Sequence, residues 1–196
     1  GCGELGYAQR VEGSVDTPLE IRRVLFVSSY HPEQVWERKV LNGVRKQLER
    51  TGYNIDLRVV YLDSKRLTST EVRNSLLEAQ LREIKGKLDL IIVLDEEANK
   101  ALFSLDIPLV KETPIVFCGV MRYSKKSGFD QVTGVICAID YEQLFLLGRK
   151  LFPEAQKVYV FSDLSGAGRV HEALARQQLS KYSERFPIIF AGDTIS

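Results

Sequence analysis

Apolar residues follow two alternating patterns along the chain. Short continuous apolar runs, such as residues 24–28, are typical of strands covered on both faces of a parallel sheet. Between these runs, apolar residues recur every three to four positions, as on one face of a helix. The alternation predicts an α/β chain of βαβ units with right-handed crossovers, forming a doubly wound, Rossmann-like parallel sheet.

The two patterns give a specific order of elements. The apolar runs predict strands at residues 24–28, 55–62, 90–94, 115–118, 132–137, 158–162 and 188–191. The helical period predicts helices at residues 34–50, 70–87, 96–105 and 168–182, and one more along the stripe Leu144, Leu147 and Leu151, which Pro153 ends. We expect the strands at 24–28 and 90–94 to be central and buried on both faces.

The element order divides the chain into three parts. Residues 1–20 are glycine-containing and polar without a period, which predicts a flexible leader. Residues 21–137 are expected to form an N-terminal α/β lobe. Residues 138–196 are expected to form the incomplete start of a second α/β lobe.

Charge and cysteine content narrow the class of protein. Lys and Arg number 27 against 26 Asp and Glu, so there is no global field for nucleic-acid binding. The apolar runs are far shorter than the about 18 residues of a membrane span. Cys2 fits either an acylated lipoprotein residue or an artificial linker, whereas Cys118 and Cys137 lie in apolar runs and are expected to be buried free thiols.

Candidate ligand-binding residues follow the predicted strands. Ligands of such sheets bind outside the carboxyl ends of the strands. The candidates are Ser29, Tyr30, Trp36, Asp63, Asp95, Gly119, Arg122, Asp163 and Gly168. We expect Tyr30, Trp36, Asp95 and Arg122 to approach one another, so that a ligand stacks on an aromatic ring while Asp95 and Arg122 hold its charged groups. The opposite face would contain Asp163 and residues 166–169.

Other kinds of site fit less well. The segment Gly166-Ala-Gly-Arg-Val-His171 resembles a dinucleotide fingerprint, but His171 stands where Gly or Ala is needed for close packing. A phosphoacceptor receiver domain needs acidic residues where the first strand ends, and Ser28 and Ser29 occupy those positions. Two histidines without a C-x-x-C pair give no metal site.

One catalytic alternative remains open. Cys118, His31 and Asp95 follow strands that can be neighbours, which is the arrangement of a Cys–His nucleophile with an orienting carboxylate. No Ser or Cys lies on a sharp elbow turn, so we expect this chain to be non-catalytic and keep a Cys–His hydrolase as the weakest alternative.

Several segments resemble one family in order and spacing. Residues 24–36 (VLFVSSYHPEQVW) resemble the strand, S-Y-H-P and W opening of type I periplasmic-binding-protein-like domains, and residues 61–66 (YLDSKR) resemble their Y-M-D-T-K-R segment. The resemblance continues in residues 114–120 (PIVFCGV), in T-G-V at 133–135 followed by Ile139-Asp140, and in a T-G-R-like turn at 165–169. At residues 121–123, Met-Arg-Tyr replaces the family's N-[DR]-[FY].

The resemblance implies a function. The family includes substrate-binding components of ABC transporters and extracytoplasmic sensor regions of membrane-bound histidine kinases. It implies a small-molecule ligand, no cofactor, an extracytoplasmic location and hinge closure on the ligand. We expect the sensor of a two-component histidine kinase, tethered by segments outside this chain, with a membrane-anchored kinase module as partner. The alternative is a transporter component with an ABC permease as partner.

Overall fold

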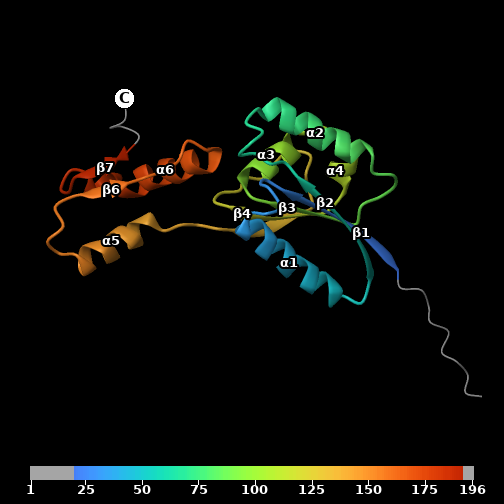
Figure 1. Ribbon diagram of the computed structural model, residues 1–196, viewed down its shortest axis with the longest axis horizontal. Coiled ribbons are helices and arrows are strands. Elements are labelled where there is room, and N and C mark those ends of the chain that lie inside the picture. Colours follow the sequence, from blue (N-terminus) through green and yellow to red (C-terminus); the bar gives the residue numbers. More distant parts are fainter. Residues whose placement is uncertain (1–19, 192–196) are drawn as a thin grey trace, which may run out of the picture.

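The computed structural model describes residues 20–191 and has two parts, each built on its own sheet (Figure 1). Its elements in chain order are β1 (Ile21–Ser28), α1 (Val35–Glu49), β2 (Asn54–Tyr61), α2 (Thr70–Arg82), β3 (Leu90–Leu94), α3 (Glu96–Ser104), α4 (Pro108–Glu112), β4 (Ile115–Val120), β5 (Val132–Ile136), α5 (Tyr141–Leu151), β6 (Val158–Val160), α6 (Gly166–Leu179), a 3-10 turn (Ser180–Tyr182) and β7 (Ile188–Phe190). The expectations for Cys2 and for residues 1–19 of the leader lie outside the described residues.

The first five strands form one parallel sheet in the order β2-β1-β3-β4-β5. The predicted parallel α/β architecture is therefore confirmed, as is the burial of β1 and β3 near the middle of the sheet. We call this part, residues 21–137, the first lobe. The part with the parallel pair β6-β7 and helices α5 and α6, residues 138–191, is the second lobe.

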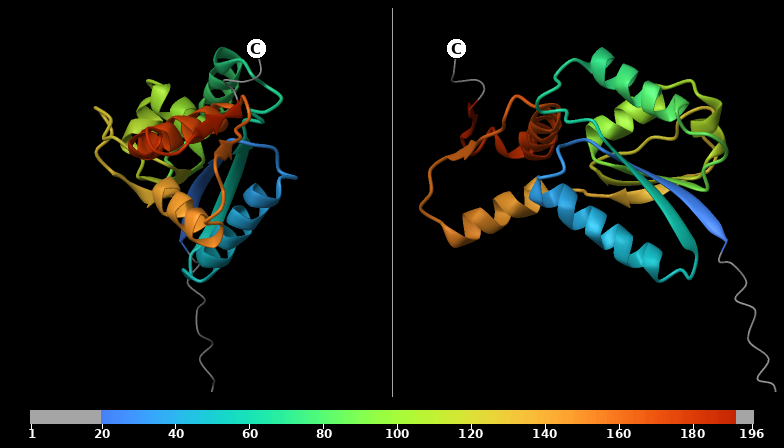
Figure 2. Two further views of the ribbon diagram at one scale, coloured as in Figure 1. Left: turned by 90° about the vertical axis from the view of Figure 1, so that its left-hand side faces the viewer. Right: turned by 45° about the vertical axis from the view of Figure 1, so that its right-hand side comes forward.

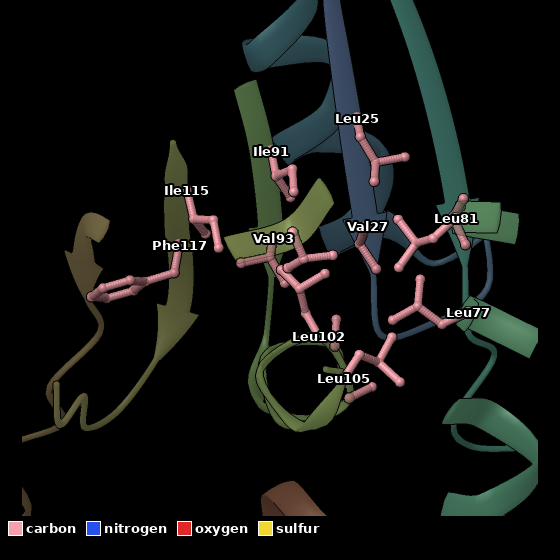
Figure 3. Close-up of a cluster of buried hydrophobic side chains, with 14 of the residues drawn as sticks. Leu25, Val27, Leu77, Leu81, Ile91, Val93, Leu102, Leu105, Ile115 and Phe117 are labelled. Carbon is pink, nitrogen blue, oxygen red and sulfur yellow. The ribbon is translucent and has the colours of Figure 1, made fainter. Parts of the chain in front are cut away.

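Alternation along the strands sends side chains to two cores. Leu25 and Val27 of β1 face α2, α3 and α4, where they pack with Leu77, Leu81 and Leu102 (Figure 3). On the opposite face, a smaller cluster of Val24, Phe26, Leu41, Ile92 and Leu94 packs under α1. Helices thus cover both faces of the first sheet, and its carboxyl edge is free to meet the second lobe.

The leucine stripe predicted for the helix after residue 140 faces outward from the described part of the chain instead of packing in a core. Helix α5 forms, but Leu144, Leu147 and Leu151 are each more than half exposed, whereas Phe145 is buried against Tyr182 and Phe186. Within residues 20–191 nothing covers the leucine face. No helix in this described range combines the length and hydropathy of a membrane span.

Between the lobes, the described chain passes through residues 137–140 (Figure 2). The Cys137 N–H donates to the Val120 carbonyl at 2.8 Å, which fixes the start of the segment to the first lobe. The Gln178 side chain of α6 donates to the Ile139 carbonyl at 3.1 Å and accepts from the Tyr141 N–H at 2.6 Å. These bonds fix the end of the segment to the second lobe.

Candidate ligand-binding site

A cavity of about 680 Å³ lies between the two lobes. The first lobe contributes Tyr30, the turn after β2, the start of α2 and one face of α3, and the second lobe contributes the turn before α6 and its first residues. The lining residues are Tyr30, Ser64, Lys65, Thr68, Thr70, Arg73, Glu97, Lys100, Asp163, Leu164, Ser165, Gly166, Arg169 and Val170. Ligand pockets for small organic molecules have this size and this concave form. We call it the inter-lobe cavity.

Arg73 and Glu97 form the wall of this cavity in the first lobe. The Arg73 guanidinium donates to the carbonyls of Leu67 and Thr68 and pairs with the Glu97 carboxylate at 2.7 Å, with 6% and 16% of the two side chains exposed. The Lys100 ammonium contacts the other Glu97 oxygen at 3.0 Å. Two cations therefore share one carboxylate, which is held in a fixed place.

The second lobe touches that carboxylate at Gly166. A Cβ atom on Gly166 would lie 2.3 Å from Glu97 Oε1, so a larger residue there requires either the Glu97 side chain or α6 to shift. Glu97 thus stands at the N-terminus of α6, where the helix dipole favours a negative charge. This is a direct contact between the lobes.

Asp163, Ser165 and Gly168 build the turn that opens α6. The Asp163 carboxylate accepts from the Ser165 hydroxyl and N–H, and these hydrogen bonds lower its pKa. The Ser165 hydroxyl caps α6 by accepting from the Gly168 N–H at 3.0 Å. A Cβ on Gly168 would lie 2.2 Å from Asp163 Oδ1, so the turn requires glycine there.

A smaller cavity of about 290 Å³ lies nearer the segment that joins the lobes. Its lining includes Tyr30, Trp36, Asp95 and Gly119 of the first lobe and His171 of α6. The Tyr30 hydroxyl lies 3.5 Å from Asp95 Oδ1. Because Tyr30 borders both cavities, it lies at their junction. The structure thus brings together three of the four residues expected to meet: Tyr30, Trp36 and Asp95.

Asp95 has a strained backbone at this position. Its φ of 73° and ψ of 167° lie in a region that only glycine adopts easily. Its Oδ1 accepts from the Glu96 N–H at 2.6 Å and caps α3, and no hydrogen bond to Oδ2 is found within the described residues. Burial raises the pKa of the Asp95 carboxyl. Backbone strain of this kind costs free energy and clusters at functional sites, which makes Asp95 a candidate for ligand contact in the smaller cavity.

Arg122 does not join the group, contrary to the expectation. Met121 is buried and borders the smaller cavity, and its N–H donates to Glu96 Oε1 at 2.9 Å. The chain bends after β4 ends at Val120, and Arg122 lines a separate hollow of about 380 Å³ with Phe103 and Tyr123.

Three other candidate residues, Ser29, Asp63 and Gly119, differ in how close they lie to the cavities. Ser29 is fully buried, and its hydroxyl donates to the Leu94 carbonyl and accepts from the Ala98 N–H. The carbonyl of Asp63 accepts hydrogen bonds from the N–H groups of Arg66 and Leu67. These bonds shape the turn from which Lys65 reaches the inter-lobe cavity. Asp63 itself lines neither cavity. Gly119 has a φ of 74° at a bulge in β4 and borders the smaller cavity.

The residues that sequence reasoning missed are Arg73, Glu97 and Lys100. Arg73 is in line with Leu77 and Leu81 on the buried face of α2, at spacings of four residues. An arginine within an apolar stripe needs an anionic partner, because a buried charge is costly unless it is paired. The position of Arg73 in line with buried leucines was therefore the signal in the sequence that could have pointed to a buried ion pair.

The two cysteines differ from each other. Cys118 is half-buried, and burial raises the pKa of its thiol to about 11. His31 contacts Glu33, and no contact joins it to Cys118 within residues 20–191. The thiol is therefore protonated at neutral pH and unsuited to act as a nucleophile. Cys137 is exposed, so its expected burial is wrong: it follows the edge strand β5, where Val135 and Ile136 are also exposed.

We expect this difference to appear in alkylation rates. At a fixed pH near 8, iodoacetamide should modify Cys137 about a hundredfold faster than Cys118, because Cys137 is exposed whereas a pKa of about 11 leaves Cys118 almost wholly protonated. Peptide mass spectrometry after timed quenching measures both sites. Concentrated guanidinium should make the two rates similar. Equal rates in the folded chain would show that Cys118 is activated after all.

Comparisons with known proteins identify the fold. No protein-family model matches the sequence, and no curated protein is similar to it. Among solved structures, a conserved domain protein from Vibrio cholerae is similar with a TM-score of 0.66 and 15% identity, covering 86% of this chain and 56% of that one. CD0873 from Clostridium difficile, a substrate binding protein in its ligand-free open form, has a TM-score of 0.55 and 17% identity, covering 86% and 56%.

A third similar structure is the ABC domain from Streptococcus pneumonia in complex with L-Trp, with a TM-score of 0.60 and 15% identity, covering 85% of this chain and 55% of that one. The chain thus spans little more than half the length of these structures. At these identities the likeness shows the fold: this chain has the type I periplasmic-binding-protein-like fold of solute-binding proteins, as the resemblance in its sequence implied.

Proposed function

We propose that this chain is the ligand-binding module of an extracytoplasmic protein and that its two lobes close on a small molecule. The observation that carries the proposal is the inter-lobe cavity, which residues of both lobes line and which meets the smaller cavity at Tyr30. A ligand that contacts both lobes binds the closed arrangement better than an open one and so shifts the equilibrium toward closure. The proposed division into lobes falls between residues 137 and 138.

Within this site we propose that Tyr30, Trp36, Asp95 and Gly119 contact the ligand from the first lobe. Asp163 and Gly168 form and place the second-lobe turn. Asp95 offers an acceptor oxygen for a hydroxyl or amino group of the ligand, and the rings of Tyr30 and Trp36 offer apolar surface.

For the module's place in a larger protein we propose the sensor of a membrane-bound two-component histidine kinase, in which closure is passed to a kinase module. The S-Y-H-P and Y-L-D-S-K-R segments are compatible with it, because the family that they resemble includes such sensors as well as transporter components. The second candidate, the substrate-binding component of an ABC transporter, is favoured by a similar solved structure that is described as a substrate binding protein. The native gene downstream of Ser196 distinguishes them, since a membrane span followed by kinase sequence fits a sensor and a stop codon fits a transporter component.

The binding function is tested at Asp95. Native mass spectrometry of the purified chain should detect one small molecule retained without a covalent bond, and calorimetry with that molecule gives its affinity. Asp95→Gly removes the carboxylate and the backbone strain together, and we expect about a 30-fold loss of affinity with an intact fold. Asp63→Gly is the matched control, because Asp63 also has a positive φ but lines neither cavity. Equal affinities of the Asp95→Gly variant and the wild type would refute the role of Asp95, and a chain that binds no small molecule would refute the binding function.

A further inference from the structure

The charges around the inter-lobe cavity do not balance. Four cationic side chains line it, Lys65, Arg73, Lys100 and Arg169, against the two carboxylates of Glu97 and Asp163. Arg73 and Lys100 share Glu97, so that the wall of the first lobe keeps one positive charge in excess. Arg73 is 5% exposed, so part of this excess is held away from water.

The remaining two cations have no carboxylate partner. Neither Lys65 nor Arg169 forms an ion pair within the described residues, and both point to the same cavity from opposite lobes. The Lys65 ammonium lies 5.1 Å from the centre of the Tyr30 ring. The acid of the second lobe that lines the cavity, Asp163, accepts two hydrogen bonds from Ser165, and the charge of Lys65 makes only a smaller contribution to its lowered pKa. These two charges are therefore available for a ligand.

The neutral groups of the cavity support the same ligand chemistry. The hydroxyl-bearing residues Ser64, Thr68 and Thr70 line it on the side of the first lobe. Hydroxyls and cations together suit oxygen-rich anions, whose oxygens accept several hydrogen bonds at once.

We infer that the ligand of the inter-lobe cavity is a small organic anion, whose carboxylate or phosphate group lies between Lys65 of the first lobe and Arg169 of the second. The inference rests on the proposed binding function and names the ligand class for it. One anionic group contacting both lobes would draw them together, so the same pair of side chains gives specificity for charge and favours closure.

The test uses simple probes: citrate for a carboxylate source, inorganic phosphate for a phosphate source, and D-glucose as a neutral control. Calorimetry at low salt should detect citrate or phosphate with a Kd in the millimolar range or below, weakening as sodium chloride is added, because the two cations are exposed. The source that binds more tightly identifies the group. Lys65→Gln and Arg169→Gln should each weaken binding at least tenfold, whereas Lys39→Gln, an exposed cation on α1 outside the cavity, should not change it.

Two results would overturn the inference: no binding of either anion, or equal binding by the wild type and both cavity variants. The binding function has its own readout. If native mass spectrometry finds a neutral molecule retained by the wild type, the module binds small molecules but not anions. If it finds an anion whose retention is lost in both cavity variants, binding function and ligand class are both upheld.

Discussion

Replacing Glu37 with glutamine is expected to remove a pH dependence of about 3 kcal/mol from the free energy of unfolding. Glu37 lies in the first turn of α1 and is 1% exposed. One carboxylate oxygen accepts from the Ser28 hydroxyl, whereas the other is buried and has no hydrogen-bond partner among residues 20–191. Burial, opposed by the Ser28 hydrogen bond and aided by the charge of Asp95, raises the pKa of Glu37 from 4.5 to about 7.

The direction of the effect follows from proton binding. Between pH 4.5 and about 7 the folded chain holds a proton on Glu37 that the unfolded chain has released, so stability decreases as pH rises through this window. Below the window both states are protonated and the penalty vanishes. Above it the folded chain bears the full cost of a buried carboxylate, which glutamine does not have.

Urea unfolding of the wild type and Glu37→Gln at several pH values from 5 to 8 measures this difference. The variant should gain stability relative to the wild type as pH rises, by about 2–3 kcal/mol over the range. Glu49→Gln, an exposed glutamate on the same helix, is the control and should show a constant difference. A pH-independent difference for Glu37→Gln would mean that this carboxyl titrates as an ordinary exposed one.

Replacing Gly166 with valine is expected to keep the lobes apart and to weaken ligand binding about a hundredfold. This factor lies toward the upper end of the changes in affinity that a coupled conformational change produces. The added Cβ would lie 2.3 Å from Glu97 Oε1. A free carboxylate would turn aside, but this one is held by Arg73 at 2.7 Å and Lys100 at 3.0 Å. Relief therefore comes from separation of α6 and α3, which opens the cleft.

Small-angle scattering should show a larger radius of gyration for Gly166→Val, and calorimetry with the molecule that co-purifies with the wild type should show the lost affinity. Gly148→Val is the matched control, because a Cβ there meets nothing within 4 Å and the residue is also helical. Should Gly166→Val leave both the scattering and the affinity unchanged, Glu97 moves freely and the contact does not limit closure.

The fold of the first lobe was predictable because burial on two faces produces continuous apolar runs. Residues 90–94 predicted β3 at its observed bounds, and the neighbouring strands differ by a few residues at their ends. The short helix α4 was not predicted, since five residues contain too little periodicity. The leucine stripe of α5 predicted the helix but not which side is covered, because period alone does not say what packs against a face.

The positions of strand ends predicted only those residues of the candidate site that directly follow a strand or begin the next helix. Tyr30, Trp36 and Asp95 meet because each follows a strand of the same sheet edge or begins the next helix. Arg122 was placed wrongly because it lies in an irregular segment after the end of β4, whose path no strand-end rule describes. Arg73 and Glu97 lie within helices, so their meeting depends on helix packing that no strand-end rule describes.

The segment that joins the lobes confines their relative motion to very few torsions. Cys137 is bonded to the first lobe through its N–H, and Ile139 is bonded to the second lobe through its carbonyl. Ala138 lies between these anchors, and peptide planarity leaves a residue only φ and ψ as soft dihedrals. For the described part of the chain, a rotation of one lobe against the other is therefore, to first order, a change in the φ and ψ angles of residues 137–139.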